Sequence, residues 1–322
     1  MTVVAAVDCG TNSIRLLVAR PDDSGRLIDI HREMRVVRLG QGVDATGRFA
    51  DEAIDRTRIA LADYVEIMRS HRVEQVRMVA TSATRDASNR DAFFGMTAEL
   101  LGCVVPDAIA EVITGDEEAR LSFRGAVGEL DSAQGPFVVT DLGGGSTEVV
   151  FGGTGTGGAD GVRAAFSADI GCVRLTERCL PSDPPTPAEV SAAQAFTRER
   201  LAEAFAAVPV DGARTWVGVA GTMTTLAALG AGLDTYDPEV IHLSRIPLDD
   251  LDQVCRRLVS MTRADRAALG PMHPGRVDVI GGGSLVTMEL ARELSARAGI
   301  TELVVSEHDI LDGIALGLLD PR

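Results

Sequence analysis

The sequence predicts an α/β protein built from two similar domains with a cleft between them. Short apolar runs alternate with helical patterns along the whole chain, which is typical of α/β architecture. An apolar strand, the pattern Asp-x-Gly-x-x-Ser and a second apolar strand occur at residues 3–19 and recur at residues 137–151. Asp8 and Asp141 are 133 residues apart in this repeat. A repeated unit in a chain of 322 residues, long enough for two cores, indicates a duplicated domain.

We expect the first domain to occupy residues 1–130. After its hairpin we predict a third strand at 26–39, a helix at 51–70, a strand at 76–80, a loop at 81–86, a helix at 89–101, a strand at 109–113 and a helix that ends near 128. The helix at 51–70 is predicted to turn six large residues inward, namely Ile54, Ile59, Leu61, Tyr64, Val65 and Met68.

The second domain is predicted at residues 131–306, after a polar connection at 129–135. Its hairpin is followed by a glycine-rich tip at 152–161, a strand at 162–168, a helix after Gly171, a helix at 188–206, a strand at 216–220 with a helix behind it, helices at 248–259 and 263–269, a strand at 277–280, a helix to about 298 and a strand at 303–305. A last helix at about 307–320 is expected to pack back on the first domain.

The second hairpin turn has the composition of a phosphate site. Three glycines, Gly143, Gly144 and Gly145, leave backbone N–H groups able to bend around an anion, and Ser146 and Thr147 add hydroxyl donors. Asp141 and Glu148 flank this turn with carboxylates, which would repel a phosphate unless a cation lay between them. The turn therefore predicts a metal-assisted phosphate site, with an ordinary glycine-rich hairpin as the alternative.

Two further segments carry candidate groups. Three hydroxyls and Arg85 follow the strand at 76–80, at the ligand edge of an open α/β sheet, where they suit an oxyanion or cap a helix. Thr114 and Glu117 fit a capping box, which leaves Glu118 without a structural role. Glu118 is a candidate general base, but the local sequence alone favours a solvated glutamate that complements the helix dipole.

Composition excludes several classes of protein. All 31 basic residues are arginines, so a P-loop lysine, a Schiff-base lysine and the strand lysine of protein kinases are excluded. The net charge of −16 argues against nucleic-acid binding. No apolar run approaches a membrane span and the sequence shows no signal-peptide pattern. Five cysteines without a CxxC pair are typical of a reducing compartment. We therefore expect a cytoplasmic protein with no membrane contact.

The ordered motifs at residues 8–13, 81–85, 115–120 and 141–148 resemble those of the Ppx/GppA family of exopolyphosphatases and guanosine pentaphosphate phosphatases. The resemblance covers essentially the whole chain. It implies two ribonuclease-H-like domains of the superfamily that contains actin, hexokinase and the sugar kinases. It also implies metal-dependent hydrolysis of the terminal phosphate of inorganic polyphosphate, with guanosine pentaphosphate as the alternative substrate.

The resemblance also implies residue roles. Arg85 and Glu118 would be catalytic, with Glu118 activating water, while Asp141 and Glu148 would hold Mg²⁺ or Mn²⁺. Substrate phosphates would bind both turns, at Asp8, Gly10, Thr11, Asn12, Ser13, Gly143, Gly144, Gly145, Ser146 and Thr147. Longer members carry a C-terminal His-Asp-type domain, which we do not expect in this chain. The resemblance to short members implies a homodimer that acts on short polyphosphate.

Two other classes of function are also compatible with the sequence. A small-molecule kinase of the superfamily would need an adenosine pocket, for which the glycines at 281–283 are the candidate, with close backbone packing as the alternative. A non-enzymatic nucleotide sensor is the other. The pair His308-Asp309 is interpreted as the start of a helix, and the remaining histidines are interpreted as surface or capping residues, namely His31, His71, His242 and His273. Phe123 is predicted to pack in the core.

Overall fold

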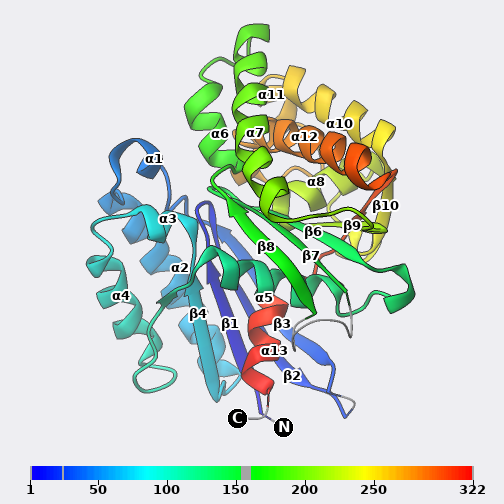
Figure 1. Cartoon of the computed structure of the whole chain (residues 1–322). Helices are drawn as coiled ribbons and strands as arrows, with labels where there is room; N and C mark the ends of the chain where they lie inside the picture. Colours follow the sequence, from blue (N-terminus) through cyan, green and yellow to red (C-terminus); the bar gives the residue numbers. More distant parts are fainter. Residues whose placement is uncertain (1, 24, 154–160, 321–322) are drawn as a thin grey trace. The chain divides into compact units, whose positions relative to one another are not determined.

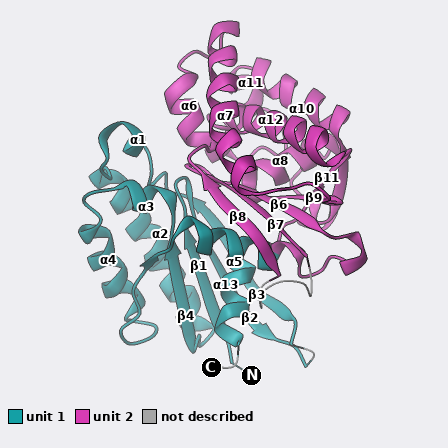
Figure 2. Cartoon of the chain, in the orientation of Figure 1, with its two compact units in different colours: residues 1–125, 310–322 teal, residues 126–309 magenta. Residues whose placement is uncertain are grey.

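The computed structural model describes residues 2–23, 25–153 and 161–320. The chain divides into two compact units, Met1–Gly125 with Ile310–Arg322 and Ala126–Asp309 (Figure 2). Each unit contains one β-sheet, and each is described by itself below. None of the helices in the described ranges is long and apolar enough to cross a membrane.

Unit 1 is a five-stranded sheet with helices on both faces (Figure 1). Its strands are β1 (Val4–Cys9), β2 (Ser13–Pro21), β3 (Leu27–Val36), β4 (Gln75–Ala80) and β5 (Glu111–Val112), in the order β3-β2-β1-β4-β5. Its helices are α1 (Val43–Thr46), α2 (Asp51–Ser70), α3 (Ser82–Asp86), α4 (Asp91–Leu101), α5 (Gly115–Val127, ending past the unit boundary) and α13 (Ile310–Leu319).

Strand β1 is buried on both faces because each face has its own helices. Ala5 and Val7 belong to the core formed with α2 and α4. Val4 and Ala6 alternate with them and pack in a second core with α13. A central strand covered on both faces explains the continuous apolar run that the sequence shows here.

Unit 2 is a six-stranded sheet with helices α6–α12. Its strands are β6 (Phe137–Leu142), β7 (Thr147–Gly152), β8 (Val162–Ala168), β9 (Thr215–Val219), β10 (Ser244–Pro247) and β11 (Glu302–Val305), in the order β10-β11-β9-β6-β7-β8. Its helices are α6 (Cys172–Cys179), α7 (Pro187–Ala207), α8 (Ala220–Gly230), α9 (Pro238–Ile241), α10 (Leu248–Ser260), α11 (Arg263–Ala267) and α12 (Ile280–Ala298), with short 3₁₀ helices η1 (Ser132–Gln134) and η2 (Pro274–Arg276).

The two sheets repeat one plan. The order β8-β7-β6-β9-β11 in unit 2 reproduces β3-β2-β1-β4-β5 in unit 1, and β10 is an additional edge strand. The central hairpins also close alike: the N–H of Gly10 donates to the carbonyl of Ser13 at 2.9 Å, and that of Gly143 to the carbonyl of Ser146 at 3.1 Å. The predicted α/β class and the predicted duplication are confirmed.

Some predicted elements are wrong. The apolar run at 277–280 is not a strand, because α12 already begins at Ile280, and four apolar residues cannot distinguish a strand from the start of a helix. The segment 81–86 is not a loop but contains the short helix α3. Ile59 is 65% exposed, since it lies about 200° around α2 from the buried Leu61. Of the glycine-rich tip at 152–161, residues 154–160 lie outside the described residues.

Candidate functional site

The carboxylates of Asp141 and Glu148 form a buried cross-strand pair. The two residues lie opposite each other in the antiparallel register of β6 and β7. Glu148 is 1% exposed, and its Oε1 accepts a hydrogen bond of 2.6 Å from the hydroxyl of Ser167 on β8. Two buried carboxylates side by side are costly unless a cation or a proton compensates their charge. Their oxygen donors fit a hard divalent cation such as Mg²⁺ or Mn²⁺.

The glycine turn next to this pair is held by the first turn of α6. The N–H groups of Cys172 and Val173 donate to the carbonyls of Gly143 and Gly144 at 3.0 and 2.9 Å. The Nε of Arg174 donates to the carbonyl of Gly145 at 2.7 Å. Three consecutive carbonyls therefore point toward α6.

The N–H groups of this turn consequently point the other way. In a trans peptide the carbonyl and the following N–H lie on opposite sides, so the N–H groups of Gly144, Gly145 and Ser146 face away from α6. Within the described residues these three N–H groups have no hydrogen-bond acceptor. Successive N–H groups turned to one side form a concave anion site, as the sequence predicts for this turn.

Gly171 and Thr147 hold the glycine turn in place. A Cβ atom at Gly171 would lie 2.4 Å from the carbonyl oxygen of Gly144, so only glycine permits this approach of α6. The hydroxyl of Thr147 donates to the carbonyl of Ile170 at 2.5 Å and is buried. This bond gives the Thr147 hydroxyl a structural role, because its proton is already donated to the backbone.

The corresponding turn in unit 1 carries a different charge. Arg15 lies opposite Asp8 in the register of β1 and β2, and its Nε and Nη2 donate to Oδ2 of Asp8 at 3.0 and 2.7 Å. The other predicted residues share this turn, where the carbonyls of Thr11 and Asn12 accept hydrogen bonds from the segment at 37–40. A Cβ atom at Gly10 would make only ordinary contacts, so the protein itself does not require glycine there.

Arg85 and Glu118 are brought together in unit 1. The Nη1 of Arg85 donates to Oε2 of Glu118 at 2.7 Å and to the carbonyl of Ile113 at 3.2 Å. Glu118 is 8% exposed, so it is not the solvated helix-start glutamate that the local sequence favours. The structural role belongs to its neighbour Glu117, whose N–H donates to the hydroxyl of Thr114 and whose carboxylate binds Arg77.

The sequence did not predict four residues that contact these two hairpins, namely Arg15, Ser167, Gly171 and Arg174. A signal for Arg15 was present, because it precedes Glu148 by the same 133 residues that separate the two aspartates. Ser167, Gly171 and Arg174 carry no such signal, since only the fold brings them to the turn.

The glycines at 281–283 are explained by close packing. They lie in α12, where a Cβ atom at Gly282 would come within 2.4 Å of Oγ1 of Thr176 and one at Gly283 within 2.7 Å of Thr222. The packing alternative therefore accounts for the cluster, and the kinase hypothesis loses its candidate adenosine pocket.

Two further side chains near these elements are structural. Phe123 is buried in the core, as predicted. Burial raises the pKa of Cys172 to about 11, so this thiol beside the glycine turn stays protonated and is no nucleophile. The candidate chemical groups are therefore Arg85 and Glu118 in unit 1, and the carboxylates and backbone N–H groups of the turn at 141–148 in unit 2.

Comparison with known proteins gives consistent results. Residues 17–317 match the Ppx/GppA phosphatase family. The chain is 65% identical over 321 residues to a protein of Mycobacterium tuberculosis named Exopolyphosphatase 2, with 99% of each chain covered. A crystal structure of an exopolyphosphatase-like protein superposes with a TM-score of 0.92 at 43% identity, covering 98% of this chain and 97% of that one. The Ppx/GppA family member of Aquifex aeolicus gives a TM-score of 0.78 at 30% identity, covering 99% and 97%.

Proposed function

Because this chain belongs to the Ppx/GppA phosphatase family, we propose that it is an exopolyphosphatase that releases orthophosphate from the ends of inorganic polyphosphate. The observation that best supports this assignment is the turn at 143–146, where N–H groups turned away from α6 adjoin the buried pair Asp141 and Glu148. Such a turn offers donors for phosphate oxygens together with ligands for a cation, and polyphosphate presents nothing but phosphates.

Each group of residues has a proposed role. The N–H groups of Gly144, Gly145 and Ser146 bind phosphoryl oxygens of the substrate, and the unit 1 turn at residues 8–13 binds further phosphate through its own backbone. Asp141 and Glu148 would hold Mg²⁺ or Mn²⁺, which when bound neutralises charge on the phosphoryl oxygens. Arg85 donates to the phosphate as a planar cation suited to bidentate contacts.

Glu118 is the proposed general base. It accepts a proton from the attacking water, whose oxygen bonds to the terminal phosphorus while the bridging P–O bond breaks. The products are orthophosphate and a chain that is shorter by one phosphate. The ion pair with Arg85 fixes the orientation of the Glu118 carboxylate before substrate binds, which reduces the reorganisation required at the moment of reaction.

Finer features of the assignment rest on the family resemblance and the sequence. We propose Mg²⁺ as the physiological cation, short polyphosphate as the preferred substrate, a homodimer as the assembly and the cytoplasm as the location. Guanosine pentaphosphate is the alternative substrate, but it would require groups that recognise a guanine base. Aromatic residues make up only 4% of the chain, so surfaces for base stacking are scarce.

A parallel assay tests the proposal. Orthophosphate release is measured with Mg²⁺ from tripolyphosphate, long polyphosphate, guanosine pentaphosphate and ATP at equal concentrations of chain ends. We expect repeated turnover with the highest kcat/KM on tripolyphosphate. Preferential hydrolysis of guanosine pentaphosphate would overturn the substrate assignment. Release of a single equivalent without turnover would indicate a nucleotide sensor, and phosphate transfer to an added alcohol would indicate a kinase.

A further inference from the structure

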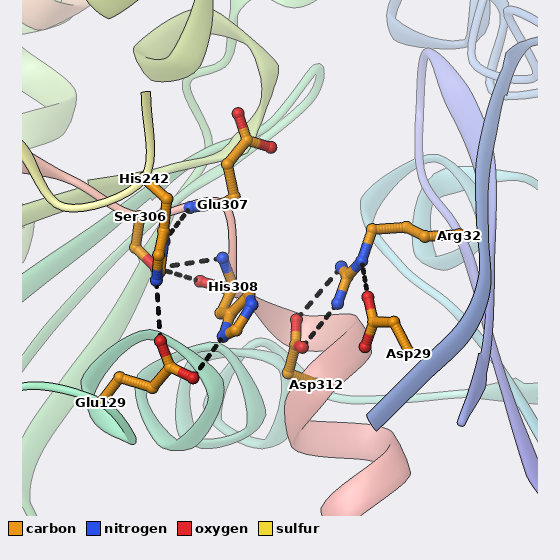
Figure 3. Close-up of polar contacts among 8 residues, drawn as sticks. All are labelled: Asp29, Arg32, Glu129, His242, Ser306, Glu307, His308 and Asp312. Carbon is orange, nitrogen blue, oxygen red and sulfur yellow. Dashed lines mark hydrogen bonds and ion pairs between the residues drawn. The ribbon is translucent and has the colours of Figure 1, made fainter. Parts of the chain in front are cut away.

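Glu129, His242 and His308 form a cluster of metal-ligating side chains in unit 2 that has no part in the proposed hydrolysis (Figure 3). One ligand atom from each residue lies within 4.8 Å of the other two. Oε2 of Glu129 is 2.9 Å from Nε2 of His242, and Oε1 of Glu129 is 4.0 Å from Nδ1 of His308. Sequence spacing gives no sign that these histidines belong together, and the fold assembles them.

The fold places the two histidines side by side. The antiparallel register of β10 and β11 pairs Ser244 with Val305, so the residues just before β10 lie beside those just after β11. The two imidazole rings consequently lie with their centroids 4.5 Å apart and their planes tilted by 32°.

Local backbone contacts fix both histidines. Leu243, next to His242, adopts a left-handed φ of 57° while its N–H donates to the carbonyl of Val305 at 2.7 Å. The hydroxyl of Ser306 donates to the carbonyl of His308 at 2.8 Å and accepts from its N–H at 3.0 Å. A branched residue held at positive φ is an unfavourable conformation that surrounding contacts must maintain, and such conformations concentrate at functional sites.

We propose that Glu129, His242 and His308 bind a divalent transition-metal ion, with Zn²⁺ the best suited. Two imidazole nitrogens and one carboxylate are a frequent ligand set for zinc, whereas Mg²⁺ prefers oxygen ligands alone. Ligands around a tetrahedral Zn²⁺ with bonds of about 2 Å are roughly 3.4 Å apart. Two contacts of the cluster, at 2.9 and 4.0 Å, bracket this value, so small side-chain rotations would complete the site.

Metal binding should change the tautomer of His242. In this structure its Nδ1 accepts a hydrogen bond of 3.2 Å from the N–H of Glu307, so the neutral ring carries its proton on Nε2 and donates it to Glu129. A metal ion on Nε2 requires the proton on Nδ1 instead. The hydrogen bond from Glu307 must then open, which gives the site a spectroscopic signature.

The bound ion would join two segments that are distant in sequence. Glu129 follows the first boundary between the units, at residues 125 and 126, and His308 immediately precedes the second, at residues 309 and 310. A shared ion would tie these two connecting segments to each other and to His242. The proposal is independent of the proposed hydrolysis, because neither its residues nor its test depends on substrate.

Metal binding to the full chain tests the site. Metal-free protein in excess Mg²⁺, which saturates oxygen-only sites, is titrated with Zn²⁺ by calorimetry and with Co²⁺ as a visible-absorption probe. We expect one equivalent of either ion to bind, and ¹⁵N NMR of the imidazoles to report a proton shift from Nε2 to Nδ1 of His242. The variants His242→Ala, His308→Gln and Glu129→Gln should each weaken binding at least tenfold.

Two matched controls separate this site from general surface binding. His71→Gln alters a histidine of the other ring pair, His31 and His71, whose centroids are 6.3 Å apart. Glu307→Gln alters a carboxylate that accepts from the Tyr236 hydroxyl and that Figure 3 shows turned away from the histidines. Both should bind metal like the unaltered chain. Absence of Zn²⁺ and Co²⁺ binding, or equal binding by the His308→Gln and Glu129→Gln variants with unchanged circular dichroism, would overturn the proposal.

Discussion

The turn between β1 and β2 and the turn between β6 and β7 occupy the same place in their sheets, but different residues face their aspartates. Arg15 lies opposite Asp8, whereas Glu148 lies opposite Asp141. The backbone of the two turns closes with the same hydrogen bond, from the third residue of each motif to the sixth. One backbone design therefore carries opposite charges at one equivalent position.

This single difference separates the proposed roles of the two turns. The guanidinium of Arg15 compensates the charge of Asp8, so the first turn needs no cation to hold its aspartate buried. The second turn has two carboxylates in facing positions, so it carries the acidic oxygens that a divalent cation prefers. The two turns share one backbone closure, and the exchange of Arg15 for Glu148 opposite the aspartate makes the second turn the candidate cation site.

The largest effect should come from removing the charge that distinguishes the second turn. Glu148→Gln keeps the size of the side chain but leaves one carboxylate to hold the cation. Since a metal ion contributes several kcal/mol to phosphoryl transfer, we expect kcat/KM to fall by about 10³-fold. Ser167→Ala is the matched control, because it removes only the hydrogen bond to Glu148 and should cost a few-fold. Near-normal turnover in Glu148→Gln would contradict the assignment.

A somewhat smaller loss of activity is expected when Glu118 is changed. This residue lies on α5 of unit 1, outside both turns. Glu118→Gln removes the proton acceptor while keeping the hydrogen bond to Arg85 possible, so kcat should fall by about 10²-fold. The adjacent Glu117→Gln provides the control, since Glu117 binds Arg77 and should leave kcat unchanged. Equal losses in both variants would indicate a structural effect rather than base catalysis. Thermal unfolding of each variant separates the two cases.

The smallest effect on activity is expected when the contact between Gly171 and the second turn is disturbed. Gly171→Ala forces a methyl group against the carbonyl of Gly144, so α6 must shift and the three N–H groups must move with it. We expect KM for tripolyphosphate to rise about tenfold and stability to fall by about 2 kcal/mol. The control is Gly95→Ala in α4, where the added methyl group has nothing within 4 Å. This variant should leave KM unchanged and should not lower stability, because alanine favours a helix over glycine. An unchanged KM in Gly171→Ala would mean that the turn does not bind substrate.

Much of the fold can be predicted from periodicity, and the reasons for success and failure are local. Helix α2 has the bounds that its sequence predicts, because twenty residues of amphipathic pattern outweigh local ambiguity. The strand predicted at 277–280 is wrong because a four-residue apolar run carries no period. The inward position predicted for Ile59 is wrong because it follows from apolar character rather than from the angle around the helix.

The candidate site is predictable only where a sequence motif contains it. The glycine turn and its carboxylates lie within eight consecutive residues, and Glu118 is identified because Glu117 already has a capping role. The sequence gives no sign of the role of Gly171, because this role depends on a contact with Gly144 that only the packed fold creates. The cluster of Glu129, His242 and His308 cannot be predicted from the sequence either. Glu129 and His242 are 113 residues apart, and the β10–β11 register brings the two histidines together.

We propose that the second turn, and not the first, holds the cation. The magnesium concentration that gives half-maximal turnover of tripolyphosphate is measured for two matched variants, Asp141→Asn and Asp8→Asn, at saturating substrate. We predict that this concentration rises at least tenfold in Asp141→Asn and stays unchanged in Asp8→Asn, even if kcat falls in both. An equal rise in Asp8→Asn, or an unchanged requirement in Asp141→Asn, would contradict the claim.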